Sequence, residues 1–342
     1  MQNKPTPRLR QGDSRFSTLS SRTEATSALV FACLHLMHPI ADRTLLFHRD
    51  YRGLTGGHLK VSHYFSHANH STRFRPQIFF APDSIRGPEN PWHGMVPPPL
   101  ESWQPAEAAA LFVAGLDWKA VPDPSPVPVI NLIQHVRHAH PGDPRRPFLA
   151  RPAVRICVSE EVADAIAGTG EVNGPIHVIP NGIDLDNIPA AADRDIPVLI
   201  AGLKNPTFAA AVAARLADAG VAVEVLYAMI PRREFLDRLS RARVAITLPN
   251  RDEGFYLPAL ESMAAGAVVV CPDCTGNRGF CRDRETAFVP RYTLQDVVAA
   301  AIMATTQPPR DAEAMRAAAA AEALTHSLES ERLAFLRILD AL

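Results

Sequence analysis

Residues 251–270 read RDEGFYLPALESMAAGAVVV, and this stretch decides the fold. An apolar run, VAITLPN (244–250), precedes it and predicts a strand. The apolar spacing that follows predicts a helix from about Phe255, and the closing AVVV predicts the next strand. Glu253 lies just before this helix and Glu261 lies some two turns inside it. A strand, a loop, a helix and a second strand in this order indicate a parallel α/β sheet.

The same stretch predicts a site for a phosphorylated ligand. In an open parallel sheet, ligands bind at the carboxyl ends of the strands, and a helix N-terminus there offers unpaired N–H groups that suit a phosphate. Gly254 allows close approach of the backbone at that point. At a rise of about 1.5 Å per residue, the carboxylates of Glu253 and Glu261 are on the order of 10 Å apart. That is roughly the separation of sugar and ribose in a nucleotide sugar, and both carboxylates can accept hydrogen bonds from hydroxyls.

Strands and helices alternate over the rest of the chain. In the second half, helical segments separate the apolar runs 197–203, 221–230, 244–250 and 267–273. In the first half, five apolar runs predict strands at 44–50, 77–83, 111–118, 127–135 and 154–159. Ser159 is the expected N-cap of the helix after the last of these. Such alternation predicts parallel sheets covered on both faces.

We therefore expect two Rossmann-like units, 43–190 and 191–342, joined near 185–195, with helices completing the chain. Residues 1–42 are expected to be a disordered tail or an upstream extension, because the first two dozen are polar and rich in Arg, Ser and Thr. Residues 85–106 are Pro-rich and irregular, and we expect a long surface excursion of the kind that often carries function. No segment reaches the roughly 20 apolar residues of a membrane span.

Composition narrows the functional classes. The 342 residues are 47% hydrophobic and carry a formal net charge of -1, which gives no electrostatic reason to expect a nucleic-acid partner. Five cysteines, three of them crowded at Cys271, Cys274 and Cys281, do not resemble a secreted disulfide framework, so a cytoplasmic location is expected. One C-x2-C with one further Cys lacks the four ligands of a structural zinc site, which favours thiols that pack a loop.

The pattern E-G-F-x-L-x-x-x-E-x-x-A-x-G-x-x-V at 253–269 resembles the E-x(7)-E signature of glycosyltransferase family 4, the group 1 glycosyl transferases. The resemblance implies the GT-B fold, in which two Rossmann-like domains with parallel sheets face a central cleft. It also implies that Glu253 contacts the donor sugar, that the amides of Gly254 and Phe255 meet the diphosphate and that Glu261 holds the ribose. Retention of anomeric configuration follows in the same way, with no cofactor and no essential metal.

Two further segments agree with this family. ICVSEEVADAI (156–166) followed by VIPNGID (178–184) resembles the end of the first domain and the crossing between domains. The family-like regions cover about 44–70 and 127–290. The resemblance adds Gly56 and Gly57 as a glycine-rich loop that faces the diphosphate.

The resemblance also assigns cationic and donor-site residues. His135, which ends a predicted strand, corresponds to the active-site histidine of the family, although His138 and His140 lie close enough to be confused with it. Lys204 follows the first strand of the second unit, where the family usually has Arg and, later, Lys. Leu203 occupies the expected Arg position, so Lys204 is expected to neutralise phosphate charge alone. The remaining donor-site candidates are Asn250, Tyr256, Leu257 and Arg278, with Asn277 beside the last as a phosphate or acceptor contact.

These expectations define a retaining glycosyltransferase that uses a nucleotide-diphosphate sugar. The acceptor is a glycan, a lipid-linked glycan or a small molecule, as in the synthesis of surface polysaccharides or glycoconjugates. A lipid-linked acceptor would bring the protein to the inner face of a membrane. The alternatives are a nucleotide-sugar epimerase on the same fold and a non-catalytic sugar- or partner-binding protein. The D-x-D at Asp184–Asp186 is interpreted as coincidence, because it falls in the crossing and not after a buried strand.

Overall fold

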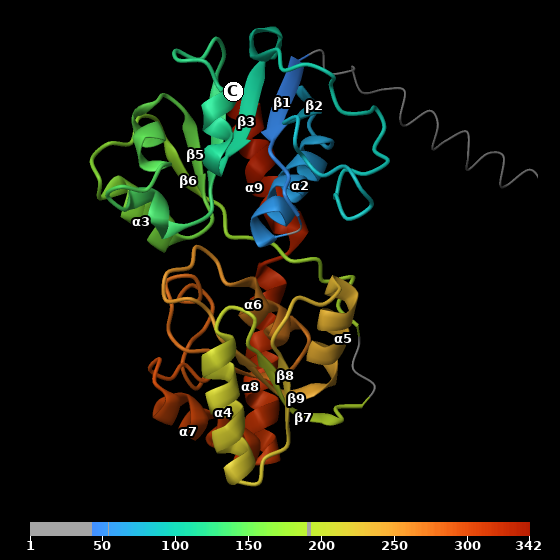
Figure 1. Cartoon of the computed structure of the whole chain (residues 1–342), viewed down its shortest axis with the longest axis vertical. Helices are drawn as coiled ribbons and strands as arrows, with labels where there is room; N and C mark the ends of the chain where they lie inside the picture. Colours follow the sequence, from blue (N-terminus) through green and yellow to red (C-terminus); the bar gives the residue numbers. More distant parts are fainter. Residues whose placement is uncertain (1–42, 54, 190–192) are drawn as a thin grey trace, which may run out of the picture. The chain divides into compact units, whose positions relative to one another are not determined.

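The computed structural model describes residues 43–53, 55–189 and 193–342, so the predicted tail lies outside the described residues. Two sheets form, and every strand pair in them is parallel, which confirms the predicted fold class (Figure 1). The first has the order β2-β1-β3-β4-β5-β6 and the second β10-β9-β7-β8. The strands are β1 (Arg43–Arg49), β2 (Phe74–Phe80), β3 (Ala110–Ala114), β4 (Val129–Ile133), β5 (Val154–Cys157), β6 (Ile176–Val178), β7 (Ile196–Ala201), β8 (Val223–Leu226), β9 (Ala242–Thr247) and β10 (Val268–Val270).

Helices connect the strands as the alternating pattern predicts. The α-helices are α2 (Gly56–Ala68), α3 (Glu160–Ala167), α4 (Pro206–Asp218), α5 (Arg232–Arg241), α6 (Leu257–Ala264), α7 (Leu294–Thr306), α8 (Pro309–Thr325) and α9 (Leu328–Ala341). Among the described residues, four short 3-10 helices are η1 (Pro105–Glu107), η2 (Gly115–Ala120), η3 (Val136–Ala139) and η4 (Arg146–Ala150). The expected N-cap Ser159 is confirmed, because its side chain accepts a hydrogen bond from the amide of Val162.

Helix α6 begins two residues later than predicted, at Leu257 and not at about Phe255. The amide of Tyr256 donates to the carbonyl of Gly276 over 2.7 Å, which keeps this part of the chain in an extended loop. Pro258 then occupies the first turn, where a missing N–H costs nothing. The start of α6 therefore depends on the loop after β10 together with Pro258, which is a local signal within 251–270.

Alternate residues of each sheet face different layers. In β7, Val198 and Ile200 belong to a core with α4 and α7, whereas Leu199 packs with α5. In β1, Leu46 belongs to a core with Trp118 of η2. The region 84–126, which the family resemblance does not cover, supplies β3, within the region of the predicted strand 111–118, and part of the cover on one face of the first sheet.

The terminal helix α9 packs in the core of the first sheet. The ring of Phe335 lies 4.9 Å from that of Tyr64 on α2 and 5.8 Å from that of Phe112 on β3. The predicted domain boundary at 190/191 assigns α9 to the second unit. The boundary stays a prediction, and we refine it by grouping α9 with the first sheet, against which it packs. Between α8 and α9 the chain lies beside the segment that connects the first unit to the second, because the amide of Ile183 donates to the carbonyl of His326.

A buried ion pair fastens α9 to α2. Lys60 Nζ lies 2.7 Å from Glu331 Oε2, and His67 Nε2 lies 2.9 Å from the same oxygen. Lys60 also donates to the carbonyl of Gly182 in the crossing. Loss of one partner from such a pair is strongly destabilising, because the other charge then stays buried alone.

No helix in the described part of the chain has the length and apolar character needed to span a bilayer.

The strand orders place one topological switch point in each sheet. Strand β1 has β2 on one side and β3 on the other, and β7 has β8 on one side and β9 on the other. The crossovers therefore diverge between β1 and β3 and between β7 and β9. Ligands of open α/β sheets bind outside the carboxyl ends of strands at such points.

Candidate functional site

Lys204 and Glu253 meet at the switch point of the second sheet. Lys204 follows β7 and Glu253 follows β9, and their Nζ and Oε1 atoms lie 2.5 Å apart. The amide of Asn250 donates to the same Oε1 over 3.0 Å. Glu253 is buried, whereas about a third of the Lys204 side chain stays exposed. The two predicted catalytic groups of the second unit are therefore in direct contact.

The loop after β10 holds the backbone of Glu253. The amide of Glu253 donates to Thr275 Oγ1 over 2.8 Å, and Thr275 Oγ1 donates in turn to the carbonyl of Glu253. A Cβ atom on Gly276 would lie 2.6 Å from the Cβ of Glu253, so this position needs glycine. Asn277 is fully buried and donates to Cys271 Sγ and the carbonyl of Pro272. Its amide therefore stabilises the loop and is not available to a ligand.

Gly254 brings this loop against the end of β4. A Cβ atom there would lie 1.9 Å from the carbonyl oxygen of Gln134 and 2.9 Å from the Cα of His135. No other residue type fits without movement of the backbone. The side chain of Gln134 also donates to the carbonyl of Gly57, which ties the start of α2 to the same place.

His135 is neutral at physiological pH. Burial lowers its pKa to about 4, and the charge of Arg137 adds to this effect while Glu253 opposes it. His135 Nδ1 accepts a hydrogen bond from the amide of Arg137 over 3.1 Å. The neutral ring therefore carries its hydrogen on Nε2, where it can donate to a ligand oxygen.

Glu261 is almost fully buried and has a cationic partner that the sequence analysis missed. Arg232, the first residue of α5, lies with its guanidinium nitrogen 2.7 Å from Glu261 Oε1. A signal for Arg232 was available, because Pro231 and Arg232 directly follow the strand run 221–230 and so lie at its carboxyl end.

A cavity of about 290 Å³ lies beside these groups. Its polar lining includes Lys204, Arg232 and Glu261, and much of its wall is apolar. The apolar lining residues are Leu59, Leu203, Leu226, Met229, Ile230, Phe235, Phe255, Tyr256 and Leu257. A small set of charged groups in an apolar pocket is typical of a binding site for a small organic ligand.

The predicted donor-site residues divide into two groups. Gly56, Lys204, Phe255, Tyr256, Leu257 and Glu261 line the cavity. Outside its lining, Arg278 forms a two-fold hydrogen-bonded ion pair with Asp273, at 2.9 and 2.7 Å. The amide of Tyr256 is occupied by Gly276, which leaves those of Gly254 and Phe255 as the candidates for an anion. The ligand roles of all these residues stay predictions.

The other sequence motifs lie apart from the cavity lining. Cys157, Cys271, Cys274 and Cys281 are buried free thiols. Within residues 43–53, 55–189 and 193–342, no three His, Cys, Asp or Glu side chains gather as metal ligands would. In the D-x-D motif, Asp184 accepts a hydrogen bond from Asn187 within the crossing.

The comparisons with known proteins agree with this geometry. Residues 183–307, which contain Lys204, Glu253 and Glu261, match the family described as "Glycosyl transferases group 1". No curated protein matches the sequence.

Solved structures with the GT-B glycosyltransferase fold resemble this chain over most of its length. Sucrose-phosphate synthase from Thermosynechococcus elongatus is 13% identical, with a TM-score of 0.66, over 87% of this chain and 98% of that one. Alr3699/HepE from Anabaena, solved in complex with UDP-glucose, is 13% identical, with a TM-score of 0.66, over 87% and 100%. A glycosyltransferase from Rickettsia africae ESF-5 is 12% identical, with a TM-score of 0.64, over 87% and 98%. The chain therefore has the GT-B fold, and the family match supports sugar transfer.

Proposed function

We propose that this protein is a retaining glycosyltransferase of family 4 that moves a sugar from a nucleotide-diphosphate sugar to a glycan, lipid-linked or small-molecule acceptor. One observation carries the proposal. In this GT-B fold, Glu253 lies at the switch point and pairs with Lys204, while Glu261 lines the adjoining apolar cavity and pairs with Arg232. Carboxylates that grip hydroxyls and cations that neutralise phosphate are what a nucleotide sugar requires.

The donor would lie across the carboxyl edge of the second sheet. Its ribose hydroxyls would bind Glu261, which Arg232 holds in place, and its base would contact the apolar wall. The diphosphate would meet Lys204 and the amides of Gly254 and Phe255, at the start of the segment that leads into α6. The sugar would then lie between Glu253 and His135, whose Nε2–H can donate to a sugar oxygen.

The reaction develops negative charge on the departing nucleotide diphosphate. Lys204 would stabilise this charge, and a group that acts on charge present mainly in the transition state accelerates the chemical step. Binding of the sugar to Glu253 would loosen the Lys204–Glu253 pair and free the ammonium for phosphate. The acceptor would attack the anomeric carbon from the face that the leaving group vacates, which retains the configuration. No metal is required by this scheme.

A mass-spectrometric screen tests the proposal. The purified chain is incubated with individual nucleotide sugars and pooled glycan acceptors, beginning with UDP-sugars because Alr3699/HepE was solved with UDP-glucose. We expect a product heavier than its acceptor by one glycosyl unit, and far less product in the same time with the variant Glu253→Gln. Nuclear magnetic resonance of that product should show the anomeric configuration of the donor.

Parallel reactions without acceptor distinguish the alternatives. An isomerised nucleotide sugar in these reactions would identify an epimerase and contradict the proposal. A thermal-shift screen against nucleoside diphosphates should show stabilisation of the wild-type chain. No response to any of them, together with no transfer, would indicate a non-catalytic protein.

A further inference from the structure

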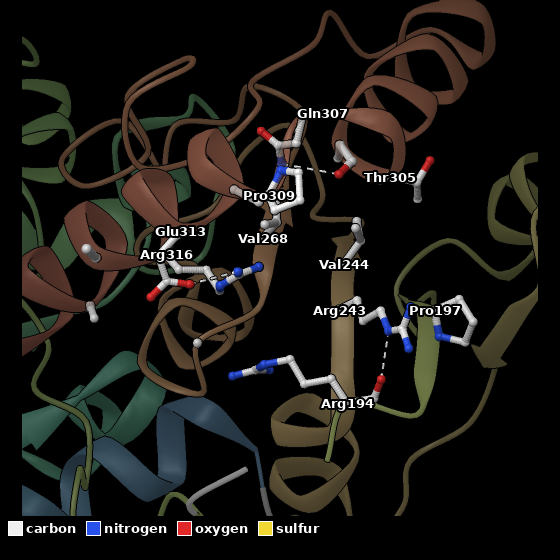
Figure 2. Close-up of a pocket in the computed structure, with 15 residues that line it drawn as sticks. Arg194, Pro197, Arg243, Val244, Val268, Thr305, Gln307, Pro309, Glu313 and Arg316 are labelled. Carbon is white, nitrogen blue, oxygen red and sulfur yellow. Dashed lines mark hydrogen bonds and ion pairs between the residues drawn. The ribbon is translucent and has the colours of Figure 1, made fainter. Parts of the chain in front are cut away.

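A second, larger cavity lies at the opposite edge of the second sheet. Its volume is about 740 Å³, and residues from the N-terminal ends of three strands form part of its wall: Pro197 in β7, Val244 in β9 and Val268 in β10 (Figure 2). The junction of α7 and α8, from Ala304 to Pro309, forms another part. Because the strands are parallel, their first residues lie away from the carboxyl edge that carries Lys204 and Glu253. This cavity is therefore separate from the proposed donor site.

Three arginines and one carboxylate line this cavity. Figure 2 shows the guanidinium groups of Arg194 and Arg316 on the same side, with Glu313 beside Arg316, whereas that of Arg243 points the other way, toward Pro197. The Arg316–Glu313 contact measures 3.0 Å and is an i,i+3 pair in which most of the Glu313 side chain is exposed. An exposed pair of this kind contributes little energy and is readily exchanged for another anion.

Arg194 is fixed in position before any ligand arrives. Its guanidinium donates to the carbonyls of Ser240, Ala242 and Ala265 at 2.8 to 2.9 Å, which are the C-terminal ends of α5 and α6. Gly266 leaves room for it, since a Cβ atom there would lie 2.6 Å from the guanidinium. Burial lowers the pKa of Arg194, and the nearby charge of Arg316 lowers it further while Glu313 opposes both. The group nevertheless stays a cation at neutral pH, because arginine begins far above it.

Arg243 has both terminal nitrogens available. Its Nε donates to the carbonyl of Arg194 over 2.8 Å, which orients the side chain, and no carboxylate in the described part of the chain pairs with it. The repulsion in this cavity is between Arg194 and Arg316, because the charge of Arg316 adds to the lowering of the Arg194 pKa. An anion between these two groups would remove the repulsion, and a phosphoryl group suits the planar fork of an arginine.

The remaining walls favour an organic body on that anion. Pro197, Val244 and Val268 offer apolar surface, and small side chains, among them Ala317 and Ala320, leave the space open. The volume lies within the usual range of small-molecule sites and exceeds what one inorganic ion fills. We propose that this cavity binds a phosphate monoester of a small organic molecule, with its phosphoryl group held by Arg194 and Arg316.

Isothermal titration of the full chain tests this site, with ribose 5-phosphate as the probe. We expect ribose 5-phosphate to bind, ribose not to bind, and inorganic phosphate to bind more weakly than the ester. Arg316→Ala should weaken the binding at least about tenfold, because a charge-assisted contact is lost. Glu313→Gln should strengthen it by a few-fold, on the order of threefold, because the competing carboxylate disappears.

Two controls keep the result specific. Arg215 on α4 is an exposed arginine outside the lining, so Arg215→Ala should leave the affinity unchanged. Lys204→Ala should also leave it unchanged, because Lys204 belongs to the other cavity. The inference is overturned if the wild-type chain does not bind ribose 5-phosphate at millimolar concentration, or if Arg316→Ala binds as well as wild type. Loss of binding in Lys204→Ala would show that the probe occupies the proposed donor site instead.

Discussion

The two switch points of this protein have the same position in their sheets but opposite environments. In the first sheet, Asp117 follows β3 and is buried, and its carboxylate contacts His48 Nδ1 at 3.0 Å, Arg49 at 2.9 Å and the amide of Asp50 at 3.1 Å. In the second, Glu253 contacts Lys204, whose side chain is partly exposed and lines a cavity. At the first switch point the polar groups are buried and contact one another, whereas the second switch point retains polar groups that a ligand can reach.

This difference separates a structural role from a binding role. His48 packs against the rings of Trp103 and Phe79, with centroids 4.9 and 5.7 Å away, so the Asp117 cluster joins β1 to the cover of its sheet. Lys204 and Arg232 instead place their charges at the cavity, each held by one glutamate. We expect substitutions at the first point to change the free energy of unfolding and those at the second to change donor binding and turnover.

The largest effect should come from Asp117→Asn. Loss of this carboxylate leaves Arg49 as a buried cation without its partner, which should lower the free energy of unfolding by about 3 to 5 kcal/mol. Chemical denaturation measures it, and donor affinity under native conditions should stay within twofold of wild type. An equally stable variant would show that the cluster does not hold the end of β1.

Glu253→Gln should reverse this pattern. The rate of sugar transfer should fall on the order of 10²- to 10³-fold, as for the loss of one oriented polar group in an active site. The melting temperature should change little, because a glutamine can still accept the hydrogen bond of the Asn250 amide. Steady-state kinetics with the donor and acceptor found in the screen measure the effect, and a rate within threefold of wild type would remove Glu253 from the reaction.

Glu261→Gln should act on affinity more than on turnover. The amide leaves Arg232 without a carboxylate and accepts weaker hydrogen bonds from ribose, so the dissociation constant of the nucleoside diphosphate should rise about tenfold. Titration calorimetry measures this directly. Arg232→Gln is the matched variant, and an effect in one variant but not in the other would mean that the pair does not work as a unit.

Leu203→Arg should strengthen donor binding a few-fold. Leu203 lines the cavity and is nearly half exposed, so an arginine would add a cation without burying it. A partly exposed cation close to a diphosphate contributes on the order of 1 kcal/mol, or about fivefold in affinity. Leu203→Gln serves as the control for side-chain length, and weaker binding by the arginine variant would place the diphosphate elsewhere.

The smallest effect is expected from the titration of His135. Its pKa of about 4 lies below the value of the unfolded chain, near 6.5, so the folded protein disfavours the charged ring. Its contribution to stability is therefore complete above pH 6.5 and is lost as the pH falls toward 4. Between pH 6.5 and 8, activity should show no step from this residue. A step in that interval that disappears in His135→Asn would contradict the neutral ring.

The sequence predicts the sheets better than it predicts the partners of the site residues. The period of the apolar residues, the helix-breaking residues and the helix caps are local signals. The sequence alone therefore predicts the parallel strands, the Ser159 cap and the positions of Glu253 and Glu261 relative to the strand and helix around them. The partners of these glutamates come from other segments. Thr275 and Arg232 lie 22 and 29 residues from the glutamates that they hold, and no local pattern encodes such distances.

Two other features depend on contacts between distant segments. Lys60 pairs with Glu331 across 271 residues, and the return of α9 to the first sheet follows from that contact and from Phe335. Arg278 is a predicted phosphate contact, and the structure adds that its guanidinium pairs with Asp273, five residues away, in an exposed ion pair. A charged residue at the correct edge of a sheet is a candidate only until its own neighbours are known.

The most direct test is a crystal structure of the chain with UDP bound. We predict density for the diphosphate against Lys204 and the amides of Gly254 and Phe255, with the ribose hydroxyls within hydrogen-bond distance of Glu261. UDP bound at the Asp117 cluster, or bound with Glu261 more than one water molecule away from the ribose, would contradict the central claim that the second switch point is the donor site.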